Sequence, residues 1–468
     1  MKNLVRRLQL LRANIPGRSA LSQVFWGLGD QGLSVGAGFL ANIALARALS
    51  KESYGVFALT YSFFSFLLGL YYAAILEPAT VYGSGRYRDR FPEYVRLIVR
   101  SSTIACVWLT ALLLLASFVV WRMAPHLVSG AVWGLALFAG FLLSGFLLRR
   151  LFYVQRQPPF AALSSLVFFL ATVGGLWLLQ TARSITGFTV YVAQAAGWLA
   201  AWAILGPKLR FGRSAQRFLD LEPDYWSEHW KYSKWVLATA FVFQFSQQGY
   251  YWILGGFLSA AETANLRAMY LLVGPVEQVF IAFTYLIVPA LAAHYAAKKM
   301  KAFLSLWRRY LLAVVGISLF YALAVRLGGK LLVHLLYAGK YDGLSPYLFA
   351  LAFVPSILWI GTTMAHALNA AEKPRFQFWA FVSGGAATFL LGIPFVLHYG
   401  LWGAVYGMLA SAAAYAATLA GSFLLAFKGA IWAEGRGPRA ETWPQRTATD
   451  EGCFEAVRTG ADEFPASR

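Results

Sequence analysis

Two carboxylates stand inside long apolar stretches of the chain. Asp30 lies near the middle of the first stretch, and Glu277 lies in the eighth, close to Gly274-Pro275. An ionised side chain at the centre of a membrane helix costs about 2.5–3.5 kcal/mol on insertion scales, so such residues are candidates for function. Each carboxylate could bind a coupling cation, H+ or Na+, or could neutralise an arginine in a structural polar network.

Two arginines flank the predicted outer ends of apolar stretches, Arg47 in the first and Arg267 in the eighth. Arginine forms bidentate contacts with phosphate, so each could guide a phosphorylated substrate. The alternative is that each side chain snorkels to the outer lipid headgroups. Lys340, in a Tyr-Ala-Gly-Lys-Tyr turn, is expected to be a solvated loop charge.

Other polar side chains are less specific. Gln244 and Gln248 share one face of the seventh stretch, where they could bind sugar hydroxyls or neighbouring helices. His366, late in the tenth stretch, could be a proton relay or a buried hydrogen-bonded side chain. Glu77-Pro78 follows the second stretch and could act as a gate or simply end a helix.

Signals for enzymatic chemistry are weak. The acidic segment Asp220–Asp224 lies in a short polar loop and is expected to be a solvated turn. The sequence contains no Walker A pattern, which argues against direct use of ATP. Cys106 and Cys453 have no spacing typical of a metal site or a disulfide framework. We therefore expect no enzyme, no metal and no cofactor beyond a possible coupling ion.

Membrane helices must position these residues. The chain is 59% hydrophobic and 13% charged, against about 45–50% and 25% in soluble domains. A membrane helix needs about 20 apolar residues. Twelve stretches meet this need: 22–46, 55–76, 102–122, 131–148, 161–180, 187–206, 235–258, 267–292, 310–327, 345–370, 378–397 and 401–427.

Basic residues fall on one side of these spans. Of the 40 Lys and Arg residues, 32 lie in the termini and in every second loop, and the other 8 lie in the alternate loops and adjoining helix ends. Lys and Arg favour the cytoplasmic side, so both termini are predicted to be cytoplasmic. The net charge of +20 thus faces lipid headgroups rather than nucleic acid.

The spans divide into two halves. Leu49-Ser50-Lys51-Glu52 follows the first span, and Leu258-Ser259-Ala260-Ala261-Glu262 follows the seventh. This repeat predicts an all-α polytopic membrane protein with two six-helix lobes around a central cavity. The predicted parts are a cytoplasmic amphipathic N-terminus (1–21), an N-lobe (22–206), a cytoplasmic linker (207–234), a C-lobe (235–427) and a disordered cytoplasmic tail (428–468).

Helix breakers occur in three spans of the second half. Gly274-Pro275 and Pro289 are predicted to interrupt span eight, Pro355 span ten, and Pro394 lies in span eleven. Such breaks are tolerated where they face protein or water, and they could serve as hinges or be static.

Several short segments resemble the polysaccharide flippase family of the multidrug/oligosaccharidyl-lipid/polysaccharide exporter superfamily. They are 42–59, 336–341, 367–375 and 399–404. Similar proteins flip a lipid-linked oligosaccharide, carried on a polyprenyl diphosphate, to the outer leaflet of the bacterial inner membrane. The resemblance implies alternating access, a role in cell-surface or exopolysaccharide synthesis, and partnership with glycosyltransferases and a glycan polymerase.

Two other functions remain open. A cation-coupled drug antiporter of the same fold would need a small pocket lined by a carboxylate. An integral-membrane glycan polymerase or ligase usually has a large outer loop or a catalytic His/Asp/Arg cluster. The longest predicted outer loop, 328–344, is modest, which disfavours the enzyme.

Overall fold

The described residues fold into twelve helical segments of membrane length. The computed structural model describes residues 18–123, 129–212, 222 and 224–434, which are almost entirely helical. Ten of the segments are long and apolar enough to cross a membrane by length and composition. The other two contain more polar residues but are 31 and 33 residues long. The predicted all-α polytopic fold is confirmed.

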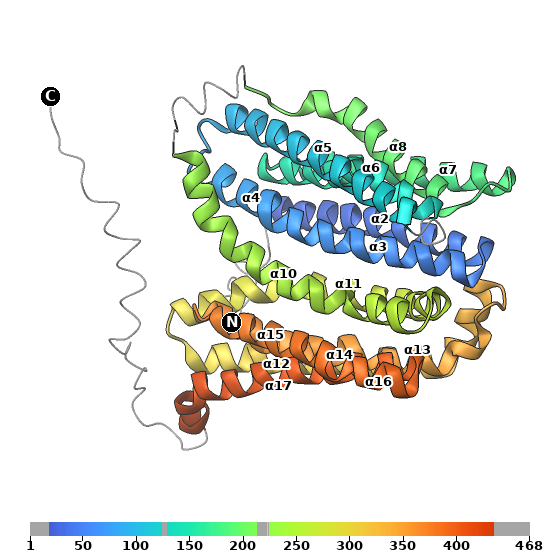
Figure 1. Cartoon of the computed structure of the whole chain (residues 1–468). Coiled ribbons are helices and arrows are strands. Elements are labelled where there is room, and N and C mark those ends of the chain that lie inside the picture. The colour runs from blue at the N-terminus through green and yellow to red at the C-terminus, as the bar shows by residue number, and fades with distance from the viewer. Residues whose placement is uncertain (1–17, 124–128, 213–221, 223, 435–468) are drawn as a thin grey trace.

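Six segments form the N-lobe (Figure 1). They are α2 (Arg18–Ala48), α3 (Lys51–Tyr71) continuing through the π-helical η1 (Tyr72–Leu76) into α4 (Glu77–Ser84), α5 (Phe91–Met123), α6 (Gly130–Val154), α7 (Pro158–Thr181) and α8 (Gly187–Leu205). Helix α7 packs between α2 and α8, and α6 packs between α5 and α8. The 3-10 turn η3 (Gly206–Lys208) follows α8.

The remaining segments form the C-lobe. They are α10 (Tyr225–Phe257), α11 (Ala260–Ala296), α12 (Met300–Tyr337), the turn η4 (Asp342–Leu344) leading into α13 (Ser345–Leu351) and α14 (Phe353–Ala370), α15 (Arg375–Leu390) with α16 (Gly392–Tyr399), and α17 (Leu401–Glu434). Helix α17 packs against α14, α15 and α16 and closes the lobe.

The two lobes meet where α3 packs against α10 and α11. The close approach requires glycine, because a Cβ at Gly55 would lie 1.7 Å from the Ala260 carbonyl oxygen. The repeated serines begin the two helices at this contact. The Ser50 hydroxyl accepts a hydrogen bond from Ser53 N at 3.1 Å, and that of Ser259 accepts one from Glu262 N at 3.2 Å. Both are N-caps, and they satisfy backbone N–H groups that a helix start leaves free.

Some predicted boundaries are wrong. Span two does not end at Glu77-Pro78, because a π-helical turn carries the helix on to Ser84. Span eight starts at Ala260 rather than residue 267, because Ser259 caps it there. Helix α10 begins at Tyr225, inside the predicted linker 207–234. Most of the predicted N-terminal segment 1–21, and residues 435–468 of the predicted tail, lie outside the described residues.

The predicted interruptions at prolines are found in some spans and not in others. Helix α11 runs without interruption through Pro275 and Pro289. Spans ten and eleven are broken, between α13 and α14 and between α15 and α16. Pro355 and Pro394 lie in the first turn after each break, where proline is tolerated because its missing N–H would have no helical partner.

The predicted orientation can be tested by cysteine labelling in a Cys106→Ala, Cys453→Ala background. A membrane-impermeant maleimide should label Gly343→Cys in intact spheroplasts, because this exposed residue follows α12 on the predicted outer side. It should label Arg88→Cys only after lysis, because that residue lies in a basic loop. If Arg88→Cys were labelled in intact spheroplasts and Gly343→Cys were not, the predicted orientation would be the wrong way round.

Candidate functional site

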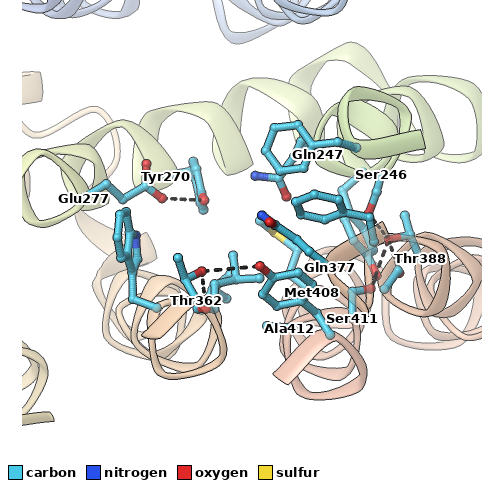
Figure 2. A pocket seen from close by; sticks show the side chains of 18 of the residues that line it. Ser246, Gln247, Tyr270, Glu277, Thr362, Gln377, Thr388, Met408, Ser411 and Ala412 are labelled. Carbon is cyan, nitrogen blue, oxygen red and sulfur yellow. Dashed lines mark hydrogen bonds between the residues drawn. The ribbon is translucent and has the colours of Figure 1, made fainter. Parts of the chain in front are cut away.

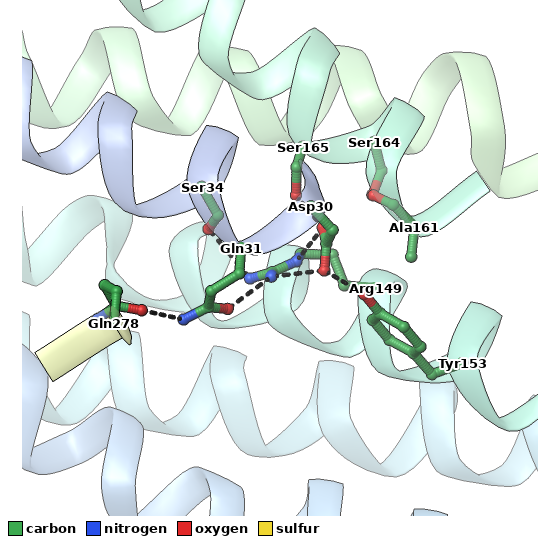
Figure 3. A network of polar contacts seen from close by, with 9 residues as sticks. All are labelled: Asp30, Gln31, Ser34, Arg149, Tyr153, Ala161, Ser164, Ser165 and Gln278. Atoms are coloured by element: carbon green, nitrogen blue, oxygen red, sulfur yellow. Dashed lines mark hydrogen bonds and ion pairs between the residues drawn. The ribbon is translucent and has the colours of Figure 1, made fainter. Parts of the chain in front are cut away.

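A buried ion pair occupies the core of the N-lobe (Figure 3). Arg149 on α6 donates to both carboxylate oxygens of Asp30 on α2, Nε at 2.9 Å and Nη2 at 2.7 Å. The Asp30 carboxylate also accepts from the Tyr153 hydroxyl at 2.7 Å and from the Ser165 hydroxyl at 2.5 Å. Four donors saturate this carboxylate. This arrangement is typical of a structural polar contact, one of the two roles that the sequence left open for Asp30.

Arg149 was placed by sequence in the cytoplasmic loop 149–160. The structure instead places it inside α6, which continues to Val154, with only 8% of its surface exposed. A buried guanidinium is stable there because Asp30 compensates its charge and Ser34 accepts a further hydrogen bond at 3.0 Å. The positive-inside count alone cannot separate a loop arginine from one that turns back into the bundle.

The N-lobe network reaches the other lobe. Arg149 donates to the Gln31 side-chain oxygen at 3.4 Å, and Gln31 donates to the side-chain oxygen of Gln278 on α11 at 3.3 Å. Gln278 is the neighbour of Glu277 in sequence. The contacts thus join the ion pair of one lobe to the helix that carries the carboxylate of the other.

A cavity of about 310 Å³ lies inside the C-lobe (Figure 2). Its walls come from five helices: α10, α11, α14, α15 and α17. The polar groups that line it are Ser246, Gln247, Tyr250, Tyr270, Glu277, Thr362, Gln377, Thr388, Ser411 and Tyr415, and Trp359, Phe243 and Phe381 add aromatic surface. This cavity is small, is lined by one carboxylate and lies within one lobe.

Glu277 is the only acidic residue among those lining residues. Its carboxylate accepts a hydrogen bond from the Tyr270 hydroxyl at 3.0 Å. Among the described residues, no Lys or Arg lies within ion-pair distance of it. Glu277 thus differs from Asp30, because its charge has no protein cation as partner. A bound cation or a proton would supply the missing charge.

Arg267 lies on the same helix as Glu277, ten residues or about 15 Å toward the predicted outer side. It is partly buried between the lobes and is not at a helix end, a position that favours a role at the interface over snorkelling to the headgroups. Its guanidinium carbon lies 4.5 Å from the Tyr61 ring centroid, and its Nε donates to the Asn42 side-chain oxygen at 3.2 Å. No carboxylate of the described residues lies within ion-pair distance. Its positive charge therefore has no anionic partner among the described residues.

The predicted outer ends of α2 and α12 are joined by basic side chains. Arg47 Nε donates to the Leu336 carbonyl at 2.6 Å, and its Nη2 donates to the Leu335 carbonyl. Lys340 Nζ donates to the Ala46 carbonyl at 3.0 Å and to that of Leu49. The prediction of a solvated loop charge at Lys340 is wrong, because α12 ends with Ala338 in a left-handed conformation that turns the chain back toward α2.

Burial lowers the pKa of the Lys340 ammonium from its ordinary value, and the nearby Lys51 adds to this effect. The carboxylate of Glu52 acts in the opposite direction. Both cations crowd one aromatic residue, because Lys51 Nζ and Lys340 Nζ lie 5.2 and 5.9 Å from the Tyr341 ring centroid. Positive charge therefore accumulates at this end of the lobe interface.

The predicted cytoplasmic end of the interface is held by different contacts. Arg90 pairs with Glu222 at 3.1 Å, and Arg86 pairs with both Glu222 and Glu228. His229 Nε2 lies 2.9 Å from the Ala74 carbonyl oxygen in the π-helical turn. These contacts fasten the start of α10 and the residue Glu222 before it to η1 and to the loop between α4 and α5, so α10 also packs on the N-lobe.

The other predicted site residues have different surroundings. Gln244 packs against Gly69 of α3, where a Cβ would lie 2.1 Å from its side-chain nitrogen. Gln248 is half-buried on the same helix. The glutamine of α10 that lines the C-lobe cavity is Gln247, which lies between them in sequence. His366 lies outside that lining, with Nδ1 3.3 Å from the Tyr310 hydroxyl. The sequence places three glutamines on this helix, and their spacing alone does not show which one faces the cavity.

The sequence matches no protein-family model and no curated protein. The structure resembles a multidrug resistance MATE family transporter of the MOP superfamily in an inward-facing conformation, with a TM-score of 0.64 and 15% identity over 89% of this chain and 96% of that one. It resembles the lipid II flippase MurJ in an inward closed conformation, with a TM-score of 0.65 and 13% identity over 95% and 94%.

A third similar structure is the MATE transporter VcmN of Vibrio cholerae, with a TM-score of 0.58 and 14% identity over 88% of this chain and 97% of that one. At these identities the similarity establishes the fold. The chain therefore has the fold of MOP-superfamily transporters.

The Asp30–Arg149 pair should behave as a unit in stability. Asp30→Asn or Arg149→Met leaves one charge uncompensated and should cost about 3–5 kcal/mol, while the double variant should recover much of this loss. Thermal unfolding in detergent measures the cycle. Ser34→Ala, which removes one hydrogen bond, should cost only about 1 kcal/mol. If Asp30→Asn unfolded like the wild type, a structural role for Asp30 would be excluded.

Proposed function

We propose that this protein flips a lipid-linked oligosaccharide, carried on a polyprenyl diphosphate, from the inner to the outer leaflet of the bacterial inner membrane. Alternating access of the two lobes is the proposed mechanism. The observation that carries the proposal is Arg267, a guanidinium held between the lobes with no carboxylate partner among the described residues. The fold shared with MATE transporters and with MurJ supports transport.

The physical task explains why such an arginine is needed. A diphosphate headgroup cannot cross hydrocarbon without partners for its charges, because the cost of desolvation is several kcal/mol or more. Arg267 presents a planar donor array that matches phosphate oxygens. The Tyr61 ring lies 4.5 Å from the guanidinium carbon, a cation–π distance, and attracts the charge without neutralising it. A phosphate would supply the charge that the protein leaves out.

Glu277 is the better candidate of the two carboxylates for ion coupling. The C-lobe cavity gives a cation room and several oxygen ligands, and among the described residues the carboxylate has the Tyr270 hydroxyl as its one hydrogen-bond partner. Asp30 lacks this freedom because Arg149 already neutralises it. We therefore assign coupling by H+ or Na+ to Glu277, and we assign the Gln247 and Gln377 amides to orienting groups inside the same cavity.

A second candidate function is drug antiport. The C-lobe cavity is a small carboxylate-lined pocket with Trp359, Phe243 and Phe381 in its walls, and aromatic faces attract organic cations. The fold is equally that of MATE transporters. Among the described residues, no group of His, Cys, Asp and Glu could hold a metal ion, which adds no support to a membrane enzyme. A glycan polymerase and glycosyltransferases are the partners proposed for the flippase.

The substrate can be tested in a strain that lacks this protein. Radiolabelled lipid-linked oligosaccharide should accumulate out of reach of an enzyme added at the outer face. Arg267→Gln should restore less than a tenth of the wild-type exposure, and Arg267→Lys should restore an intermediate level because lysine lacks the bidentate fork. Arg326→Gln, which removes an exposed arginine on the outer part of α12, is the matched control and should complement fully.

Two outcomes contradict the flippase. Normal exposure of single glycan units without polymerised glycan would assign a polymerase or ligase. Unchanged glycan together with altered sensitivity to toxic organic cations would assign the antiporter.

Ion coupling can be tested in proteoliposomes with an imposed H+ or Na+ gradient. Glu277→Gln should remove the dependence of transport on the gradient, because a neutral amide cannot balance a cation, and Glu277→Asp should keep it in part. Glu262→Gln, in the first turn of α11, is the control and should keep full dependence. Gradient-driven transport by Glu277→Gln at the wild-type rate would rule out the assignment.

A further inference from the structure

The two helices that end at the predicted outer face cap each other. Arg47 stands in the last turn of α2 and donates to the last carbonyls of α12. Lys340 stands just beyond the end of α12 and donates to the last carbonyls of α2. Each helix end thus receives a cation from the other lobe. We call these four hydrogen bonds the outer latch.

The carbonyl groups in the outer latch need these donors. At the end of α12 the N–H groups of Ala338 and Gly339 bond to the His334 carbonyl, and that of Lys340 bonds to the Tyr337 carbonyl. The Leu335 and Leu336 carbonyls are left for Arg47. A helix C-terminus carries partial negative charge and attracts cations. A neutral carbonyl is nevertheless a weaker partner for arginine or lysine than an anion.

The surroundings of the outer latch also favour an anion. Arg47, Lys340 and Lys51 carry three positive charges, and Glu52 is the acid that acts on Lys340. Asp342, the next acid along the chain, is paired with His334 at 2.8 Å. Tyr341, with 1% of its surface exposed, has a hydroxyl with no hydrogen-bond partner among the described residues. A spare donor and excess positive charge therefore lie together where the lobes close.

We propose that the outer latch is a diphosphate-binding site, in which the headgroup replaces the backbone carbonyls as partner of Arg47 and Lys340 and so opens the outer end. This inference rests on the proposed flippase function and adds Lys340 to the residues that handle the substrate. The exchange favours opening because charge-assisted bonds to phosphate are stronger than those to neutral carbonyls. The closed end is then stable only while no headgroup has reached it.

The route to the outer latch runs along α2. Asn42, which accepts from Arg267, lies five residues or about 7.5 Å below Arg47 on the same helix. A headgroup held at Arg267 would thus stand one and a half turns from the next cation. A diphosphate has two charged groups and could bridge part of this distance. The cations would act in sequence, first Arg267 and then Arg47 with Lys340.

The experiment measures opening and binding separately. Spin labels at Ser53→Cys on α3 and Gly343→Cys after α12, in the Cys106→Ala, Cys453→Ala background, report the distance across the outer end in nanodiscs. Farnesyl diphosphate is the probe, and farnesol is the control without charge. In the otherwise wild-type protein, farnesyl diphosphate should shift the distance distribution to longer values, and farnesol should leave it unchanged.

Variants should separate the opening of the outer end from the binding of farnesyl diphosphate. Arg47→Gln and Lys340→Gln should show longer distances without ligand, should not respond to farnesyl diphosphate, and should bind it at least tenfold more weakly. Lys340→Arg should restore closing and binding, because it keeps the charge. Gly55→Ala should open the outer end by steric clash with the Ala260 carbonyl yet bind farnesyl diphosphate as tightly as the wild type. Gly256→Ala is the control for Gly55→Ala, because a Cβ added at Gly256 would have nothing within 4 Å.

Two results of the distance measurement would overturn the proposal of an outer latch. One is a Lys340→Gln variant that stays closed without ligand. The other is a Lys340→Gln variant that opens with farnesyl diphosphate as the wild type does. The proposed function is refuted by a different test. A deletion strain with normal exposure of lipid-linked glycan would exclude the flippase even if farnesyl diphosphate opened the outer end. Normal flipping by Lys340→Gln would refute the latch and leave the flippase standing.

Discussion

A charge that leaves water needs a partner, and in this protein the kind of partner differs from one charge to the next. Arg149 has a carboxylate, Arg267 has an amide oxygen and an aromatic face, and Arg47 has backbone carbonyls. Only the first arrangement balances charge. The other two satisfy hydrogen bonds and leave the charge itself uncompensated. This gradation separates groups that hold the fold together from groups that can exchange partners during transport.

The two lobes use the same architecture for different purposes. In the N-lobe, Asp30 collects four donors and leaves no room for a ligand. In the C-lobe, Glu277 faces a cavity of about 310 Å³ and has one donor. The two lobes thus hold a charge-balanced polar core on one side and a carboxylate that faces a cavity on the other. The Gln31–Gln278 hydrogen bond links the two cores through the interface.

Much of the fold could be predicted from the sequence, because span length and basic loops report directly on the membrane. The repeated serines were also informative, because an N-cap acts locally and Ser50 and Ser259 both cap the helix that follows. The site was harder to predict. Arg149 and Lys340 look like loop charges until the tertiary packing places a carboxylate or a helix end beside them. Gln247 differs from Gln244 only in the direction it faces, which depends on the rotation of α10 against α15 and α17.

The π-helical turn at Tyr72–Leu76 bears on the history of the chain. A π-turn holds more residues than an α-turn, and the Glu77 N–H accordingly reaches back five residues to the Tyr72 carbonyl. Each residue of an α-helix turns the chain by about 100°. A homologue without the bulge would therefore be one residue shorter here, or it would present a different face of α4 to α10. An alignment gap within 72–76 would indicate that the inserted residue and the contact of His229 with the Ala74 carbonyl arose together.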